Sequence, residues 1–222
     1  MNRQYKDKLE KTKHHGIYQL RLGKKRIFFT KSLDGKTFFN EKIKNGYREF
    51  DIRRSKLAAA IAKGISDIFI EKNSLVLYLG ASHGYTSSFI SDIVGINGAV
   101  YCVEFAPRVI RDLVEICDQR ENMAPILADA NQPDYEVGKV DIIYQDIAQK
   151  NQVEILFKNL KYLKKGGYCL IAIKSRSIDV TKNPSEIFGE VKNKLKSRLK
   201  IIDFKVLDPF ERDHCFFVCQ MT

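Results

Sequence analysis

Five groups of glycines and polar residues directly follow apolar stretches that are typical of β-strands: Gly80 to Gly84 (GASHG), Glu104, Asp129, Asp146 and Lys174. In an open α/β sheet the carboxyl ends of the strands share one edge, and ligands bind there. Glu104 lies 24 residues after Gly80, about where a carboxylate binds ribose hydroxyls. Glycines let the backbone approach a ligand, and the next helix offers unpaired N–H groups. The stretch from 74 to 105 therefore predicts a nucleotide-binding βαβ unit.

The loop after the first of these strands indicates which nucleotide is bound. Ser82 stands where the dinucleotide pattern G-x-G-x-x-G needs its second glycine, and no G-x-x-x-x-G-K-[ST] motif for nucleoside triphosphates occurs. A carboxylate for ribose without a phosphate-binding loop favours S-adenosylmethionine. A βαβ unit that binds no ligand is the alternative.

The same loop also fits G-x-S-x-G, the nucleophile motif of α/β-hydrolases, with Ser82, Asp146 and His214 in that family's chain order. That fold places several strands of its main sheet before the nucleophile, whereas here a basic, turn-rich segment and one helix precede it. The chain also lacks an HGGG-type segment, and Glu104 would have no role. A hydrolase is therefore only a remote alternative.

The residues after the fourth strand indicate the acceptor of a methyl group. Asp146-Ile-Ala-Gln149 differs from the [N/D]-P-P-[Y/F] loop that is common in amino-group methylation of bases. No cysteine lies there for methylation at a pyrimidine carbon. An acidic residue beside lysines suits a hydroxyl acceptor, because the acid takes the proton and the cations stabilise the developing alkoxide. Asp146 and Lys174 fit this chemistry.

The elements that must position these residues divide the chain into two expected domains. Residues 1–52 predict a basic arm and a small antiparallel sheet, with strands at 16–22, 25–30, 37–39 and 47–52 separated by turn residues. Residues 53–222 begin with a helix expected at 53–69 and then alternate strands and helices. This alternation predicts a doubly wound, Rossmann-like α/β fold with a mostly parallel sheet and an antiparallel last strand.

Composition restricts the classes of function. Residues 1–70 hold 18 of the 38 Lys and Arg but only 7 of the 27 Asp and Glu, which indicates a surface facing a polyanion or, alternatively, a solvated basic face. The five cysteines suggest neither a disulfide framework nor a metal site. No apolar run is long enough to cross a bilayer, and the N-terminus lacks a signal core, so cytoplasmic or nuclear residence is expected.

Taken together, the sequence resembles the fibrillarin family in its archaeal form. The resemblance extends over residues 16–220 and rests on the segments YRE (47–49), RSKLAAAI (54–61), VLYLGAS (76–82), SDIVG (91–95), VEF (103–105), RDL (111–113), DA (129–130), VDIIYQDIAQ (140–149), KSRSID (174–179) and ERDH (211–214). In the loop, His83 and Tyr85 stand where the family usually has small residues. A bulky Tyr85 is expected to stack near the cofactor or to narrow its pocket.

The resemblance implies site residues that spacing alone does not give. The family's catalytic set corresponds to Lys56, Asp146, Lys174 and His214. Without the resemblance, Lys56 reads as a surface charge and His214 as an isolated strand residue. The implied cofactor-binding residues are Gly80, Ala81, Ser82, Tyr85, Thr86, Glu104, Phe105, Asp129, Ala130, Asp146, Ile147, Ala148 and Gln149, with Glu104 at the ribose and Asp129 and Ala130 at the adenine.

The resemblance also implies an activity: RNA-guided 2′-O-methylation of ribose in rRNA, with tRNA as a further substrate, in a box C/D ribonucleoprotein. The implied partners are a guide RNA, a Nop-domain scaffold protein and a kink-turn-binding protein, and no membrane is involved. Such a protein is cytoplasmic in archaea and nucleolar in eukaryotes. Two alternatives stay open: a methyltransferase that acts on protein or a small molecule, and a cofactor-binding assembly protein without activity.

Overall fold

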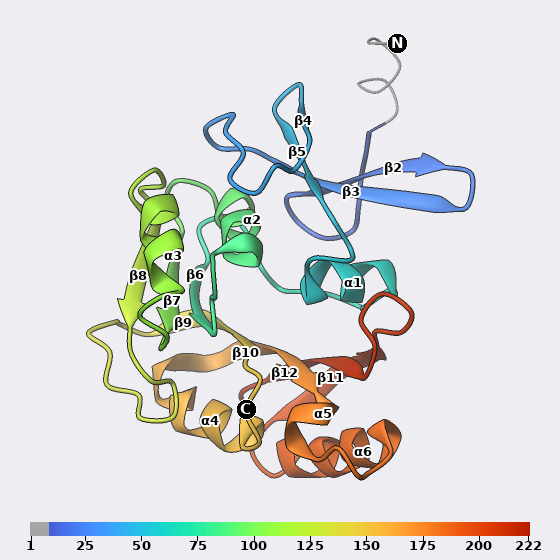
Figure 1. The fold of residues 1–222 in the computed structure, drawn as a ribbon, viewed down its shortest axis with the longest axis vertical. Helices are drawn as coiled ribbons and strands as arrows, with labels where there is room; N and C mark the ends of the chain where they lie inside the picture. The colour runs from blue at the N-terminus through green and yellow to red at the C-terminus, as the bar shows by residue number, and fades with distance from the viewer. Residues whose placement is uncertain (1–8) are drawn as a thin grey trace.

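The computed structural model describes residues 9–222, so part of the arm expected at residues 1–15 lies outside the described residues. The first of its two sheets is five-stranded and wholly antiparallel, as expected (Figure 1). Its strands, in the spatial order β1-β2-β3-β5-β4, are β1 Glu10–Lys11, β2 Ile17–Leu22, β3 Lys25–Lys31, β4 Ile43–Lys44 and β5 Tyr47–Phe50.

The prediction of a strand at residues 37–39 is wrong, because the strand that forms that edge of the sheet is β4. The backbone N–H groups of Phe38 and Phe39 donate to the Glu41 carboxylate at 3.2 and 2.7 Å. A local side chain thus takes the donors that a strand would use.

The second sheet has seven strands in the order β11-β12-β10-β9-β6-β7-β8. Its strands are β6 Leu75–Leu79, β7 Ala99–Glu104, β8 Met123–Leu127, β9 Val140–Asp146, β10 Leu163–Lys174, β11 Lys200–Val206 and β12 His214–Gln220. Only β12 runs against its neighbours, pairing antiparallel with both β10 and β11. The expectation of a mostly parallel sheet with an antiparallel last strand is confirmed.

Helices cover both faces of this sheet (Figure 1). One face carries α1 Lys56–Ala62, α2 Tyr85–Val94 and α3 Ile110–Cys117, whose apolar residues share one core. The other face carries α4 Gln152–Asn159, a 3₁₀ turn Leu160–Tyr162, α5 Ser175–Ile178 and α6 Pro184–Leu195, which enclose a second core. The alternating side chains of the strands divide between these two cores.

The helix expected at residues 53–69 is too long. It ends at Ala62, and Gly64 then adopts a left-handed conformation with φ +77°. Glycine enters that region without steric cost and commonly terminates helices. Ile65 and Ile68 are nevertheless fully buried, so the apolar pattern that suggested a longer helix reflects burial of an irregular segment.

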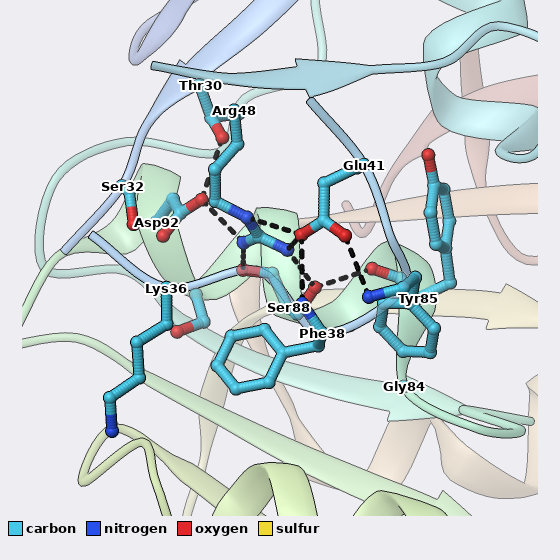
Figure 2. Close-up of polar contacts among 12 residues, drawn as sticks. Thr30, Ser32, Lys36, Phe38, Glu41, Arg48, Gly84, Tyr85, Ser88 and Asp92 are labelled. Atoms are coloured by element: carbon cyan, nitrogen blue, oxygen red, sulfur yellow. Dashed lines mark hydrogen bonds and ion pairs between the residues drawn. The ribbon is translucent and has the colours of Figure 1, made fainter. Parts of the chain in front are cut away.

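The first sheet is joined to α2 by buried charges (Figure 2). Arg48 on β5 is fully buried, and its guanidinium donates to Glu41 at 2.6 Å, to Asp92 at 2.8 Å and to the Ser88 carbonyl at 3.2 Å. Thr30 donates to the same Asp92 carboxylate at 2.7 Å. The core is also shared, since residues of β2, β3 and β5 pack with those of α1 and α2. We therefore propose that the boundary at residue 52 separates the two sheets, although the two parts of the chain share one hydrophobic core.

No helix within residues 9–222 is long and apolar enough to cross a membrane. The five cysteines are buried and free. In the same described residues, no group of three or more His, Cys, Asp or Glu side chains is arranged to hold a metal ion.

Candidate active site

A cavity of about 230 Å³ opens at the carboxyl edge of the seven-stranded sheet, where β6, β7, β8 and β9 end. Its walls are formed by Gly80, Ser82, Val103, Glu104, Phe105, Ala128, Asp129, Ala130, Asp146, Ile147, Ala148 and Gln149. Ten of the thirteen cofactor-binding residues predicted from the sequence are among them. Ala81, Tyr85 and Thr86 are not, and Val103 and Ala128 were not predicted.

Glu104 is held in the cavity wall by backbone donors. One carboxylate oxygen accepts from the Ser82 N–H at 2.9 Å, and the other accepts from those of Phe105 and Ala106 at 3.1 and 3.0 Å. The side chain is 7% exposed. The oxygen that binds Ser82 has one further lone pair, so a fixed Glu104 can still accept a hydrogen bond from a hydroxyl group in the cavity.

Gly80 places the start of the loop against the end of β9. Its φ is +80°, and a Cβ built there would lie 2.5 Å from the Asp146 carbonyl oxygen and 3.0 Å from Ile147. A side chain would therefore displace the backbone that carries Asp146. The glycine is required by this contact as well as by its conformation.

We expect Gly80→Ala to lower the free energy of unfolding by more than the roughly 1 kcal/mol typical of alanine at a positive φ. Gly166→Ala is the matched control, because Gly166 has φ +76° but no atom within 4 Å of the point where an added Cβ would lie. Urea unfolding of both variants separates the clash from the conformational strain. Equal losses would show that the contact with Asp146 costs nothing.

Lys56 and Asp146 form an ion pair beside the cavity. The Lys56 Nζ lies 2.9 Å from Asp146 Oδ2, and the two side chains are 21% and 24% exposed. Burial alone would lower the pKa of Lys56, but the charge and hydrogen bond of Asp146, together with the charge of Glu211, raise it above its ordinary value. Lys56 is therefore protonated at neutral pH and places a positive charge against the Asp146 side chain.

Lys174 and His214 lie at the same edge on the next two strands. They are register partners of β10 and β12, while Asp146 aligns with Ala172 of β10. Lys174 is exposed, and its backbone N–H and carbonyl are both hydrogen-bonded by the Gln152 side chain at 3.1 Å. The predicted catalytic set is thus gathered at one edge, with direct contact between Lys56 and Asp146.

The orientation of the His214 ring follows from its neighbour. Its Nδ1 lies 2.6 Å from the Arg212 carbonyl oxygen. Because a carbonyl only accepts hydrogen bonds, Nδ1 carries the hydrogen and donates. In the neutral ring, Nε2 is then the acceptor.

The hydrolase alternative is not supported. Asp146 forms an ion pair with Lys56, and His214 is hydrogen-bonded to the Arg212 carbonyl. Within residues 9–222, no hydrogen bond joins Ser82, Asp146 and His214, so the relay that a nucleophilic serine needs is absent from the described part of the chain.

Neither of the two unusual loop residues lines the cavity. His83 lies 2.9 Å from Asp112 on α3 in an exposed pair. Tyr85 packs its ring on Phe39 and Phe89, with centroid distances of 5.2 and 5.1 Å. The Tyr85 ring thus packs against other aromatic rings and does not line the cavity, and its effect on the cofactor stays a prediction.

Three further residues matter to the site and were not assigned these roles from the sequence. Ser55 caps α1, Glu211 contributes to the raised pKa of Lys56, and Thr86 bonds to Ser55 instead of lining the cavity. A serine immediately before a helical stretch is a recognisable cap. The proximity of Glu211 depends on tertiary packing and has no local pattern.

The strand order with its single antiparallel strand, and the cavity with a carboxylate at the end of β7, define a Rossmann-like protein of the S-adenosylmethionine-dependent methyltransferase fold. The profile of the fibrillarin family matches residues 9–222. This chain belongs to the fibrillarin family.

Individual relatives agree with this assignment. The chain is 52% identical over 213 residues, 91% of this chain and 92% of the relative, to the fibrillarin-like rRNA/tRNA 2′-O-methyltransferase of Methanocaldococcus jannaschii. It is similar to Aeropyrum pernix fibrillarin, which was solved with natively bound S-adenosyl-L-methionine, with 41% identity, 95% and 97% coverage and a TM-score of 0.86. It is also similar to a fibrillarin solved in complex with Nop5p, with 40% identity, 96% and 100% coverage and a TM-score of 0.88.

Proposed function

We propose that this chain catalyses RNA-guided 2′-O-methylation of ribose in rRNA, with tRNA as a further substrate and S-adenosylmethionine as the methyl donor. The observation that carries the proposal is the Lys56–Asp146 pair beside a cavity with a carboxylate in its wall. Relatives named as rRNA/tRNA 2′-O-methyltransferases support the choice of substrate. Nothing in the site specifically favours a protein or small-molecule acceptor.

The residues of the cavity fit this cofactor. Glu104, held by three backbone N–H groups, keeps one lone pair free to accept from a ribose hydroxyl. The cavity wall also carries Asp129 and Ala130, which we assign to the adenine, and the 63% exposed Phe105 ring. When bound, S-adenosylmethionine supplies an activated methyl group.

The chain's own residues then prepare the acceptor hydroxyl. Asp146, paired with Lys56, accepts or orients the proton of the ribose 2′-OH. The raised pKa of Lys56 favours its protonated form and therefore a role as a cation over that of a base. Its charge and that of Lys174 stabilise the alkoxide-like oxygen, and His214 lies beside Lys174 on the substrate side.

For partners, we propose a Nop-domain scaffold protein, a box C/D guide RNA and a kink-turn-binding protein. The solved complex of a fibrillarin with Nop5p supports the scaffold. Guide RNA and the kink-turn-binding protein follow from the family's mode of target selection, in which base pairing chooses the nucleotide.

The test is methyl transfer to a guide-matched RNA by the reconstituted complex, with scaffold and guide each added or omitted. We expect one methylated ribose, at the guided position and only in the complete mixture. Methylation of an unguided protein or metabolite, with none of the guided RNA, would overturn the proposal.

A basic groove supports an RNA substrate. The groove has a volume of about 760 Å³ and runs between the β1–β2 segment and the end of α2. Lys13, Lys31 and Lys72 line it, and none of the three forms an ion pair with the residues that the structure describes. Asp92, also at the groove, is neutralised by Arg48 and Arg120. Glu71 is a further carboxylate in the lining and lies 3.6 Å from His15, so Lys13, Lys31 and Lys72 leave an excess of positive charge that suits phosphodiester groups.

Replacing Lys13, Lys31 and Lys72 by Gln should therefore lower the affinity for RNA and make that affinity less dependent on salt concentration. Each lost phosphate contact to single-stranded RNA reduces the slope of log K against log salt by about 0.7, which gives roughly 2 for three. The matched control replaces Lys165, Lys196 and Lys200, which are exposed on other surfaces. Fluorescence anisotropy with labelled RNA distinguishes the two variants. Equal effects would mean that only net charge matters.

A further inference from the structure

Two consecutive residues at the start of α1 contact two different elements: Ser55 contacts the start of α2, and Lys56 contacts Asp146 at the end of β9. Ser55 is the N-cap of α1, and its hydroxyl oxygen accepts from the Ala58 N–H at 3.4 Å and from the Thr86 hydroxyl at 3.0 Å. Lys56 is the first residue of the helix and pairs with Asp146 at 2.9 Å. Both hydroxyl groups are buried, with Ser55 2% and Thr86 7% exposed. One short segment therefore connects the start of α2 with the catalytic ion pair.

The preceding residue extends this connection. The Arg54 guanidinium lies 4.2 Å from the centroid of the Tyr85 ring, and Arg54 Nη1 donates to the Phe39 carbonyl at 2.9 Å. The Tyr85 hydroxyl accepts from the Asp51 N–H at 3.4 Å. Burial raises the pKa of Tyr85 to about 12, so the ring stays neutral and attracts the guanidinium through its π-face. Tyr85 is the first residue of α2 and immediately follows the glycine loop.

The loop is thus attached at its start to Asp146 and at its end to the two residues that precede Lys56. At its start, Gly80 is packed against the Asp146 backbone. At its end, Tyr85 and Thr86 contact Arg54 and Ser55. Between these points, the Ser82 N–H binds Glu104 in the cavity wall. A displacement of the loop must move both ends, and hence both members of the Lys56–Asp146 pair.

We propose that Arg54 and Ser55 are positioning residues that couple the cofactor loop to Lys56. Order in the loop places Lys56 against Asp146, and the ion pair in turn holds the loop in its binding-competent form. By linkage, the free energy that an ordered loop contributes to the Lys56–Asp146 pair equals the free energy that the pair contributes to the order of the loop. This inference rests on the proposed function for the identity of the cofactor but not for the acceptor.

Loss of the Ser55 hydroxyl should weaken cofactor binding although Ser55 does not line the cavity. Ser55→Ala is expected to raise the Kd for S-adenosylmethionine by about 3- to 10-fold, as the loss of one buried hydrogen bond predicts. It should also shift the alkaline limb of the pH profile of kcat/KM downward, because a less constrained Lys56 loses part of its interaction with Asp146. Ser55→Thr keeps the hydroxyl and should restore both quantities.

A matched control separates coupling from simple destabilisation. Asn183 caps α6 by accepting from the Ser185 N–H at 3.0 Å and does not line the cavity. Asn183→Ala removes a helix cap, as Ser55→Ala does, and should lower Tm comparably. Isothermal titration calorimetry of the full chain with S-adenosylmethionine alone needs no RNA substrate. Only Ser55→Ala should change the Kd.

The aromatic part of the connection is tested by a double-mutant cycle on Arg54→Ala and Tyr85→Ala. If the two side chains act as one unit, the double variant binds S-adenosylmethionine as weakly as either single variant. Tyr85→Phe, which keeps the ring and loses only the bond to Asp51, should stay within about 2-fold of the original Kd.

Two results would overturn the inference. The first is a Ser55→Ala variant that matches Asn183→Ala in Kd and in pH profile. The second is full additivity of Arg54→Ala and Tyr85→Ala. If the unmodified chain binds no S-adenosylmethionine, the proposed function itself fails. If it binds but shows neither effect, only the coupling fails.

Discussion

Asp146→Asn is expected to lower kcat for ribose methylation by about 10²- to 10⁴-fold, the range typical of losing a general acid–base group. The amide has nearly the same shape as the carboxylate but cannot take the proton of the 2′-OH. It also removes the anion that Lys56 contacts at 2.9 Å, and the Lys56 side chain is only 21% exposed. The measurement is single-turnover methylation in the reconstituted complex, with the Kd for S-adenosylmethionine determined in parallel.

The parallel Kd decides what a loss of activity means. We expect it to rise by about 3- to 10-fold, far less than kcat falls, because the ion pair that holds the loop is lost while Glu104 keeps its hydrogen bonds. A loss of activity matched by a loss of binding would assign Asp146 to the cofactor alone. Unchanged methylation would show that another group handles the proton.

The pH dependence of the Lys56–Asp146 pair has a defined sign. The pKa of Lys56 is raised above its ordinary value of 10.5. The pair's contribution to stability is therefore fully present below 10.5 and is lost as the pH rises through the raised pKa. Lys56 stays protonated under ordinary assay conditions, so a pH profile of methylation near neutrality reports other groups.

Sequence patterns predicted the carboxyl-edge residues because they depend on local order. Each of Glu104, Asp129, Asp146 and Lys174 follows a recognisable strand, and parallel strands bring their carboxyl ends to one edge whatever their lateral order. Gly80 was predicted because close backbone approach requires a residue without Cβ.

Other features depend on contacts that no local pattern records. Tyr85 faces Phe39 and Arg54, which are 46 and 31 residues earlier, so a loop residue expected at the cofactor belongs to the interface with the first sheet. The strand expected at residues 37–39 was lost to the Glu41 carboxylate. In both cases a long-range or side-chain interaction prevailed over the local propensity of the segment.

The buried network around Arg48 leads to the second large prediction. Arg48→Met should lower the free energy of unfolding by about 3–5 kcal/mol, because it leaves the carboxylate of Glu41 buried without its cation. Arg176→Met is the control, since its pair with Asp213 is exposed on both sides and such pairs contribute roughly 0–1 kcal/mol. Urea unfolding monitored by circular dichroism measures both.

The pH dependence of this loss identifies its cause. Burial alone would raise the pKa of Glu41, but Arg48 and nearby backbone N–H groups lower it below its ordinary value of 4.5. The contribution of Glu41 to stability is thus present above 4.5 and is lost as the pH falls through the lowered pKa. Arg48→Met should remove most of this acid dependence. If Arg48→Met is destabilised equally at neutral and acid pH, the variant has lost packing instead of the ion pair. If it unfolds like Arg176→Met, the first sheet does not need these charges to hold α2.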